Sequence, residues 1–312
     1  MIDLIALPGV PQAAESQSDH RRWSAATAHS SGSSADLQDD VRRLIGSGWV
    51  EEIEIRADDP AQIQAAVEAG RLAGRRVRVV GFTWLVEPVP TTDGERWIRD
   101  GEAWVLIPKG RSRPQLAVKR LIDVVIAAAL LVVLSPVLLA AAISVKLGSS
   151  GPIFYRWRVL GESGRPFDGF KFRTMVPEAD ELKPSLLHLN ERQGPVFKIA
   201  KDPRVIPLGH WLRKHSLDEL PQLWNVLVGD MSLVGPRPVF HSEYRNFELW
   251  QMRKLSVKPG LTCLWQVEGR HTITDFSDWA RLDLKYIDTW SLASDVAILF
   301  RTPMAVIKGT GH

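Results

Sequence analysis

Apolar and charged residues alternate in two short runs within the first third of the chain. The runs VEEIEIR (50–56) and RVRVV (76–80) both show the period of two that is typical of half-buried strands. Between them, Asp59 followed by Pro60 has the form of a helix N-cap with proline at the first helical position, and residues 63–74 have helical spacing. This pattern predicts a β-α-β unit.

A further strand is predicted at WVLIP (104–108), which extends this unit to a small α/β module, partly Rossmann-like, over residues 41–112. No G-x-G-x-x-G separates its first strand from its helix, so docking or regulation is favoured over nucleotide binding, and a plain scaffold is the alternative. Residues 12–40 are rich in Ala, Ser, Gln and Asp with little periodicity. We therefore expect a flexible arm over residues 1–40.

The longest apolar run is VVIAAALLVVLSPVLLAAAI (124–143), which only Ser135 and Pro136 interrupt. Its length meets the criterion of about 20 residues for a membrane segment, and a buried helix is the alternative. Proline removes a backbone donor and serine can satisfy a freed backbone group, so Ser-Pro predicts a break in the helix.

Basic residues flank this run on both sides, with Lys119 and Arg120 before it and Lys146, Arg156 and Arg158 after it. Because basic residues favour the cytoplasmic side, such flanks favour a hairpin that enters the membrane and returns. The sequence thus predicts a re-entrant helix hairpin over residues 116–147, with a kinked spanning helix as the alternative. Residues 291–309 are typical of a helix at the membrane interface or of a core helix.

Composition narrows the class of protein. The chain has 312 residues, of which 45% are hydrophobic and 24% charged, which excludes a wholly disordered chain and a polytopic membrane protein. The single cysteine, Cys263, forms no internal disulfide, and the eight histidines lack metal-ligand spacing. Residues 1–115 hold 14 Lys/Arg and 17 Asp/Glu, whereas residues 116–312 hold 25 and 19. The basic part favours phosphate-bearing partners or an anionic membrane.

The strongest candidate for chemistry is HSLDELPQLWN (215–225), which contains Asp218 and Glu219. Ser216 and Glu219 have the spacing of a capping box, so a structural role for the acids is one interpretation. Cations occur at three places: in FKFRTM (170–175), directly before the two acids, and in GPRP (235–238). Several cations near two carboxylates suit phosphate handling, because the acids can supply a nucleophile and a ligand for Mg²⁺. The cations are Lys171, Arg173, Arg213 and Arg237.

A series of motifs resembles the bacterial sugar transferases in content and order. It covers about residues 115–312 and includes KR-x-x-D before the apolar run, GPIFYR, GRPF-x-x-x-KFRTM, DPR, SLDELPQLWNVL-x-GDMSLVGPRP, KPGLT-x-LWQV-x-GR and RLDL-x-YID-x-WSL. These proteins are the monotopic phosphoglycosyl transferases, or polyprenyl-phosphate hexose-1-phosphate transferases. The resemblance implies a membrane-associated α+β domain with a re-entrant hairpin, and a cytosolic catalytic part over residues 148–312 at the inner membrane.

The same resemblance implies transfer of a sugar 1-phosphate from a nucleotide diphosphate sugar to undecaprenyl phosphate, which begins an exopolysaccharide, capsule, O-antigen or other glycoconjugate. Asp218 is then expected to form a covalent intermediate with the phosphosugar, with Mg²⁺ held near Asp218 and Glu219. The positions that match or extend the phosphate pocket are Lys171, Arg173, Arg213, Arg237 and Arg270. A homo-oligomer is compatible with this assignment.

Three positions depart from the family pattern. Trp157 and Val159 stand where the family carries Gln and Arg, and Pro207 replaces a basic residue. These departures keep open an alternative, a catalytically impaired membrane scaffold that binds a nucleotide sugar or an assembly partner. A nucleic-acid partner is not expected, because no recognised nucleic-acid-binding motif accompanies the positive charge.

Overall fold

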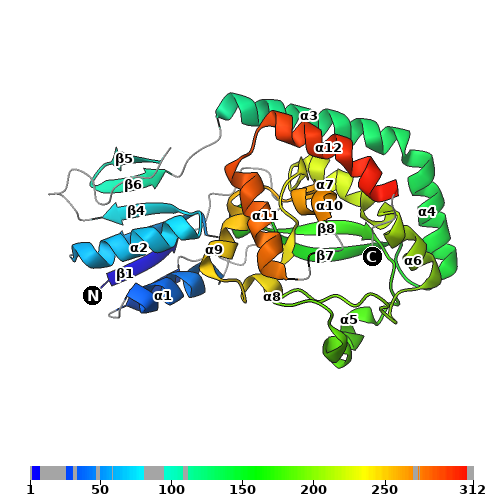
Figure 1. The fold of residues 1–312 in the computed structure, drawn as a ribbon, viewed down its shortest axis with the longest axis horizontal. Helices are drawn as coiled ribbons and strands as arrows, with labels where there is room; N and C mark the ends of the chain where they lie inside the picture. Colours follow the sequence, from blue (N-terminus) through cyan, green and yellow to red (C-terminus); the bar gives the residue numbers. More distant parts are fainter. Residues whose placement is uncertain are drawn as a thin grey trace, which may run out of the picture. The chain divides into compact units, whose positions relative to one another are not determined.

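The computed structural model describes residues 2–7, 26–30, 34–46, 50–57, 59–80, 95–107, 112–269, 273 and 275–307 (Figure 1). The chain forms two compact units. Unit 1 comprises Met1–Ser112, Glu162–Pro166 and Tyr244–Ser256, and unit 2 comprises Arg113–Gly161, Phe167–Glu243 and Val257–His312.

Unit 1 contains a six-stranded mixed sheet with the strand order β2-β1-β3-β4-β6-β5. The β3 and β4 strands are parallel and the other neighbours are antiparallel. The predicted β-α-β unit is confirmed as β3-α2-β4, and the Asp59 carboxylate accepts a hydrogen bond from the Ala61 amide at 3.0 Å. The elements are β1 Ile2–Leu7, β2 Ala26–Ser30, α1 Ser34–Gly46, β3 Glu52–Arg56, α2 Pro60–Leu72, β4 Arg76–Val80, β5 Arg96–Asp100 and β6 Ala103–Ile107.

The prediction of a flexible arm over residues 1–40 is wrong for the parts of it that the structure describes. The β1 strand lies between β2 and β3, and its Ile2, Leu4 and Ala6 side chains are buried. Pairing with strands that are distant in sequence orders this segment, and composition does not reveal such pairing. The α1 helix also begins within the predicted arm, while residues 8–25 and 31–33 lie outside the described residues.

Two segments from the C-terminal part of the chain complete unit 1. They form η1 (Glu162–Gly164) and the consecutive helices α9 (Leu249–Met252) and η4 (Arg253–Ser256). The Arg75 side chain is only 2% exposed, and its Nη2 donates to the Tyr244 hydroxyl at 3.1 Å. Because the hydroxyl is buried, the pKa of Tyr244 is raised, although the charge of Arg75 opposes this. The unit that holds the predicted α/β module therefore depends on residues beyond 41–112.

Unit 2 begins with the helices α3 (Arg113–Val133) and α4 (Ser135–Gly148). Among the described residues, no single helix is long and apolar enough to cross a membrane. The α3 and α4 helices meet this criterion only together, with a bend of 62° between them. The predicted break at Ser135 and Pro136 is confirmed: the Ser135 hydroxyl donates to the Val132 carbonyl at 2.8 Å, and Pro136 lies in the first turn of α4.

The remainder of unit 2 surrounds a small sheet with the order β10-β7-β8, accompanied by a parallel pair, β9 and β11. Its core includes Ala127 of α3, Trp157 and Val159 of β7, Leu223 of α7 and Ile298 of α12. The elements are β7 Phe154–Leu160, β8 Pro166–Phe172, α5 Ala179–Leu182, η2 Pro184–Leu189, α6 Pro207–Lys214, η3 Leu217–Gln222, α7 Leu223–Val228, β9 Ser232–Val234, β10 Val239–Phe240, α8 His241–Tyr244, β11 Gly260–Thr262, α10 Leu264–Gly269, α11 Phe276–Asp288 and α12 Leu292–Ile307.

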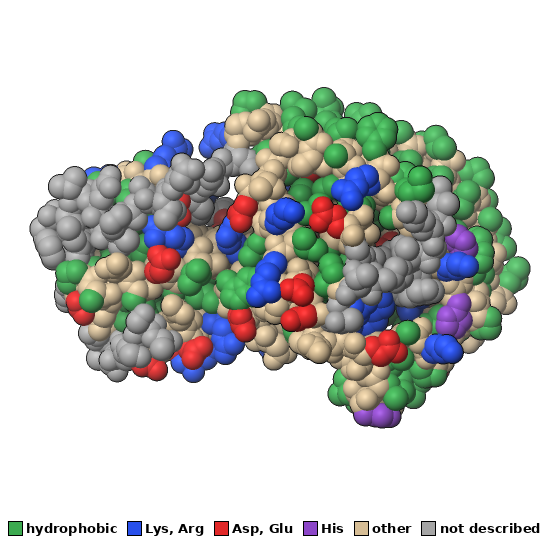
Figure 2. Space-filling model, viewed as in Figure 1, with side chains coloured by type: hydrophobic (Ala, Val, Ile, Leu, Met, Phe, Trp, Pro, Cys, Tyr) green, Lys and Arg blue, Asp and Glu red, His purple; other side chains and the backbone are tan. Residues whose placement is uncertain are grey.

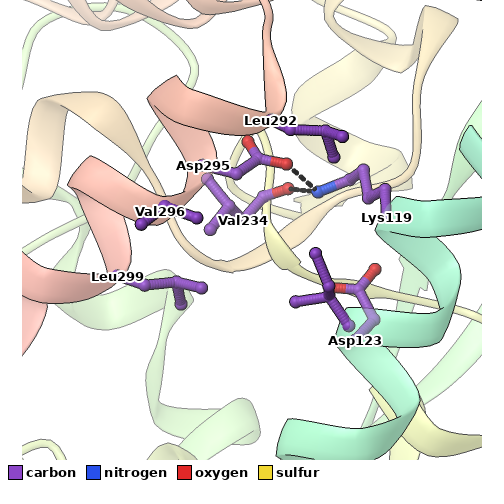
Figure 3. Close-up of a pocket in the computed structure, with 8 residues that line it drawn as sticks. Lys119, Asp123, Val234, Leu292, Asp295, Val296 and Leu299 are labelled. Carbon is purple, nitrogen blue, oxygen red and sulfur yellow. Dashed lines mark hydrogen bonds and ion pairs between the residues drawn. The ribbon is translucent and has the colours of Figure 1, made fainter. Parts of the chain in front are cut away.

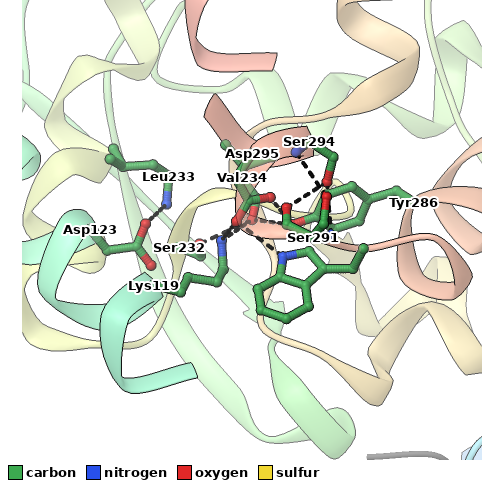
Figure 4. A network of polar contacts seen from close by, with 10 residues as sticks. Lys119, Asp123, Ser232, Leu233, Val234, Tyr286, Ser291, Ser294 and Asp295 are labelled. Atoms are coloured by element: carbon green, nitrogen blue, oxygen red, sulfur yellow. Dashed lines mark hydrogen bonds and ion pairs between the residues drawn. The ribbon is translucent and has the colours of Figure 1, made fainter. Parts of the chain in front are cut away.

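A buried polar network joins α3 to α12 and β9 (Figure 4). Lys119 Nζ lies 2.6 Å from Asp295 Oδ2 and 3.0 Å from the Val234 carbonyl oxygen. The Tyr286 hydroxyl and the Trp290 Nε1 group donate to the same carboxylate at 2.7 and 3.1 Å. Every ionised group of this network thus has a partner of opposite charge or a hydrogen-bond partner, as buried charges require.

The other two charged residues of the KR-x-x-D motif also bind backbone groups of unit 2. The Asp123 carboxylate accepts from the Leu233 amide at 3.0 Å. Arg120 donates to the carbonyls of Val226 and Leu227 at 2.6 and 2.8 Å, where a cation complements the C-terminal end of α7. The same region lines a small pocket (Figure 3). Its Lys119 and Asp295 bind each other and its Asp123 binds the Leu233 amide, so we assign it to structure. Its walls are formed by Lys119, Ile122, Asp123, Val234, Leu292, Asp295, Val296 and Leu299.

Candidate active site

The two candidate carboxylates lie on η3, directly after a strained residue. Ser216 has φ 53° and ψ 22°, in the left-handed region, and its side chain makes no capping bond. The predicted capping box is therefore wrong: the Ser216 amide donates to the Arg213 carbonyl at 3.0 Å, and the Glu219 carboxylate binds Lys171 instead. A left-handed serine costs roughly 1–2 kcal/mol, and such strain gathers at functional sites.

Two of the predicted cations lie at Glu219. Lys171 of β8 donates from Nζ to Glu219 Oε1 at 2.7 Å, and both side chains are 16% exposed. The Arg237 Nη1 atom lies 4.0 Å from the same carboxylate oxygen, and its side chain is 34% exposed. Lys171 is thus held in the site, whereas Arg237 remains accessible to a phosphate from solvent.

Asp218 lies within the electrostatic reach of Arg213, in the last turn of α6. Asp218 is 8% exposed, and Arg213 Nε donates to Thr174 Oγ1 at 2.9 Å. Burial lowers the pKa of Arg213, while the negative charges of Asp218 and Asp202 oppose this shift. A Cβ at Gly209 would lie 2.2 Å from the Thr174 carbonyl oxygen, so glycine allows the close approach of α6 that brings Arg213 to Thr174.

The structure does not bring Arg173 into this cluster. Its guanidinium donates to the carbonyls of Ser149 and Ser150 at 2.9 and 2.6 Å, and the residue is 5% exposed. Gly151 has φ 112°, and a Cβ there would lie 2.0 Å from Arg173 Nη1. Arg173 therefore fixes the chain where it leaves α4. Arg270 lies outside the described residues.

Sequence reasoning did not identify a buried ion pair near the site. Arg204 binds Asp202 through Nε and Nη2 at 2.9 and 2.7 Å, and each side chain is 6% exposed. Burial of Asp202 opposes ionisation, but the hydrogen bonds and charge of Arg204 outweigh it and lower the pKa of Asp202. The D-P-R motif (202–204), in which a carboxylate precedes a guanidinium by two residues, could have indicated this ion pair from the sequence.

We predict that Asp202→Asn destabilises the protein in a pH-dependent manner. Since the folded-state pKa is depressed, the ionised carboxylate stabilises the fold above its unfolded pKa of about 3.9, and this contribution is lost as pH falls through the lower folded value. Breaking a buried pair costs about 3 kcal/mol at pH 7. Urea unfolding at pH 7 and pH 3 should show the gap between wild type and variant narrowing at the lower pH; a constant gap would contradict this assignment.

The donor set is compatible with Mg²⁺. Among the described residues there is no group of three or more His, Cys, Asp and Glu side chains with the arrangement of a metal site. Mg²⁺, however, is commonly bound by one or two carboxylates together with substrate phosphates. Asp218 and Glu219, adjacent on η3, would be the carboxylates of such a site.

Comparison with known proteins identifies what the chain is similar to. The model of a family described as bacterial sugar transferase matches residues 114–309, more than half of the chain. The galactosyl transferase CpsE of Streptococcus agalactiae is 47% identical over 161 residues, which cover 52% of this chain and 36% of that protein. The exopolysaccharide production protein ExoY of Rhizobium meliloti is 39% identical over 197 residues, which cover 62% of this chain and 87% of that protein.

A third relative is the UDP-glucose:undecaprenyl-phosphate glucose-1-phosphate transferase of Escherichia coli, which is 41% identical over 199 residues. The match covers 61% of this chain and 40% of that protein. Apart from ExoY, the relatives named here thus share well under half of their length with the chain.

Proposed function

Because the chain belongs to the bacterial sugar transferase family, we propose that it is a phosphoglycosyl transferase that moves a sugar 1-phosphate from a UDP-sugar to undecaprenyl phosphate. The observation that carries this proposal is the Asp218-Glu219 pair, which is set among the cations Lys171, Arg213 and Arg237. The names of relatives that use undecaprenyl phosphate or make exopolysaccharide support the acceptor and the role in starting a glycan.

In the first step, a carboxylate oxygen of Asp218 attacks the phosphorus that bears the sugar. A P–O bond to Asp218 forms, the bond from that phosphorus to the bridging oxygen breaks, and UMP leaves with the electron pair. In the second step, a phosphate oxygen of undecaprenyl phosphate attacks the same phosphorus and Asp218 leaves. The product is an undecaprenyl-diphosphate sugar, and the carboxylate is regenerated without any redox partner.

The neighbouring cations have separate roles in this scheme. Arg237 is accessible and binds the donor phosphates, and Arg213 stabilises the charge that develops around Asp218. Lys171 orients Glu219 through their 2.7 Å contact and adds its positive charge to the binding of the donor phosphates. Mg²⁺, held by Asp218 and Glu219 when bound, would neutralise charge on the diphosphate.

We further propose that α3 and α4 enter the cytosolic face of the inner membrane and return. Both helices present large apolar side chains to solvent, which line the outer rim of unit 2 in Figure 2. On the neighbouring α12, Ile298 is buried in the core, which supports the interpretation as a core helix, whereas the 81% exposure of Phe300 is compatible with a helix at the membrane interface. The exposed apolar residues of the helix pair include Leu121, Val125, Val132, Val133, Leu139, Ile143 and Leu147.

Replacing Pro136 by Ala or Leu should push the bent pair toward a straight, spanning helix, because the replacement restores a backbone donor and removes the ring clash. Cysteines at the exposed Ser112 and Ser150, before and after the pair, report the topology. In otherwise wild-type protein both should react with an impermeant thiol reagent from the same side of inverted vesicles. In the Pro136 variants only one should react; an unchanged labelling pattern would refute the role of proline.

The proposed activity is tested with purified protein, Mg²⁺ and a panel of UDP-sugars. We expect UMP release in the presence of undecaprenyl phosphate, and an intact mass increased by one phosphosugar in its absence. The panel is then repeated with sugars linked to other nucleoside diphosphates. Folded protein that binds a nucleotide sugar but releases no nucleoside monophosphate from any of them would instead favour the scaffold alternative.

A further inference from the structure

The ammonium group of Lys171 has an aromatic neighbour as well as a carboxylate. The Lys171 Nζ atom lies 4.2 Å from the centroid of the Trp157 ring, and 2.7 Å from Glu219 Oε1. Trp157 lies on β7 and is 4% exposed, and Lys171 lies on the neighbouring β8. The distance is within the range in which an aromatic face attracts a cation.

The position of the Trp157 indole is determined from two sides. Phe240 of β10 packs against it edge-on, with ring centroids 5.1 Å apart and an interplanar angle of 66°. On β8, a Cβ at Gly169 would lie 2.3 Å from Trp157 Nε1, so glycine makes room for the indole. Because Gly169 and Lys171 are two residues apart on one strand, they lie on the same face of the sheet, where the indole contacts both.

Filling the core does not explain why this residue is tryptophan. The Trp157 Nε1 atom is buried and finds no hydrogen-bond partner among the described residues, and leaving a donor unsatisfied is unfavourable. Phenylalanine would fill much of the same space without this penalty. The larger indole face is, however, the best aromatic partner for a cation.

We propose that Trp157 is a positioning residue that holds the Lys171 ammonium in the active site, in contact with Glu219 and directed to the donor phosphate. The inference rests on the proposed function. An aromatic ring carries no net charge, so it fixes the ammonium without neutralising it, whereas a second carboxylate in its place would cancel its attraction for phosphate. The Glu219 carboxylate, which contacts Lys171, is also shared with Arg237.

The test compares three variants at one position. Trp157→Phe keeps an aromatic face, Trp157→Leu removes it, and Trp157→Gln introduces the residue expected from the family. The Kd for UDP-sugar should rise severalfold to about thirtyfold in the Leu and Gln variants, the range spanned by cation–π interactions, and by less in the Phe variant. Trp97→Leu, at a buried tryptophan of unit 1, is the matched control and should leave this Kd unchanged.

A double-mutant cycle separates positioning from packing. If Trp157 acts through Lys171, Trp157→Leu should weaken UDP-sugar binding strongly in wild type but hardly at all in the Lys171→Ala background. The same loss in both backgrounds, or no loss in either, would overturn the proposal.

A spectroscopic readout tests the contact without any turnover. In protein with ¹³C-labelled lysine, the Cε protons of Lys171 should be shifted upfield by the indole ring current, and Trp157→Leu should abolish this shift. Its absence in wild type would overturn the inference. By contrast, a wild-type protein that shows the shift and binds UDP-sugar but releases no UMP would contradict the proposed function and leave the positioning contact intact.

Discussion

Asp218→Asn should abolish the covalent phosphosugar adduct and lower turnover by at least about a thousandfold, because a carboxamide has nearly the same shape as a carboxylate but is a poor nucleophile. The residue is 8% exposed on a short turn, so the isosteric change should preserve the packing around it. The measurement is the intact mass of the protein after incubation with UDP-sugar, together with the rate of UMP release when undecaprenyl phosphate is added.

Two further variants make this result specific. Asp278→Asn changes an exposed carboxylate of α11 that pairs with Arg281, and it should keep wild-type turnover. Glu219→Gln should slow both steps but still permit some adduct, because the nucleophile remains. If Asp218→Asn retained the adduct, or if Asp278→Asn lost it, the assignment of Asp218 as the nucleophile would be refuted.

Lys119→Met should lower the free energy of unfolding of unit 2 by about 3 kcal/mol, because it leaves the buried Asp295 carboxylate without its counter-charge. The two side chains are 11% and 8% exposed, so water cannot take over the role of the ammonium. For a unit of this size, such a loss corresponds to about 6–12 °C in Tm. Thermal unfolding in detergent, followed by near-UV circular dichroism, measures the effect.

A matched lysine provides the control. Lys146 lies on α4, is exposed and makes a long 3.5 Å contact with the Gly151 carbonyl, so Lys146→Met should change Tm little. In the double variant Lys119→Met, Asp295→Leu, part of the lost stability should return, because no uncompensated charge is left. Equal effects of the two lysine variants would show that the network does not hold α3 to α12.

Local patterns in the sequence predicted the elements that local forces determine. The N-cap at Asp59 begins α2, and Ser135 with Pro136 ends one helix and begins the next. The β1 strand was missed because it is ordered by β2 and β3, which follow it at a distance in the chain. No local pattern indicates that residues 244–256 complete unit 1, since the forces involved are long-range packing.

The candidate site was predicted in part, and its errors have physical causes. Lys171, Glu219 and Arg237 are brought together as expected. Arg173, two residues from Lys171 in the sequence, binds the carbonyls after α4, a role that composition cannot distinguish from phosphate binding. The spacing of Ser216 and Glu219 matches a capping box, but the left-handed backbone of Ser216 overrides that pattern.

Unit 1 consists of three separate segments of the chain, and this determines how late in synthesis it can be completed. Tyr244, Phe247 and Met252 are fully buried, and Arg75 has its hydrogen bond to Tyr244. When the first 112 residues have left the ribosome, these side chains have not yet been synthesised, and the surfaces that they cover are still open. Since domains generally fold as units during synthesis, unit 1 is complete only when residue 256 has emerged, after the apolar α3–α4 pair. The apolar α3–α4 pair is therefore synthesised before the last segment of the N-terminal unit.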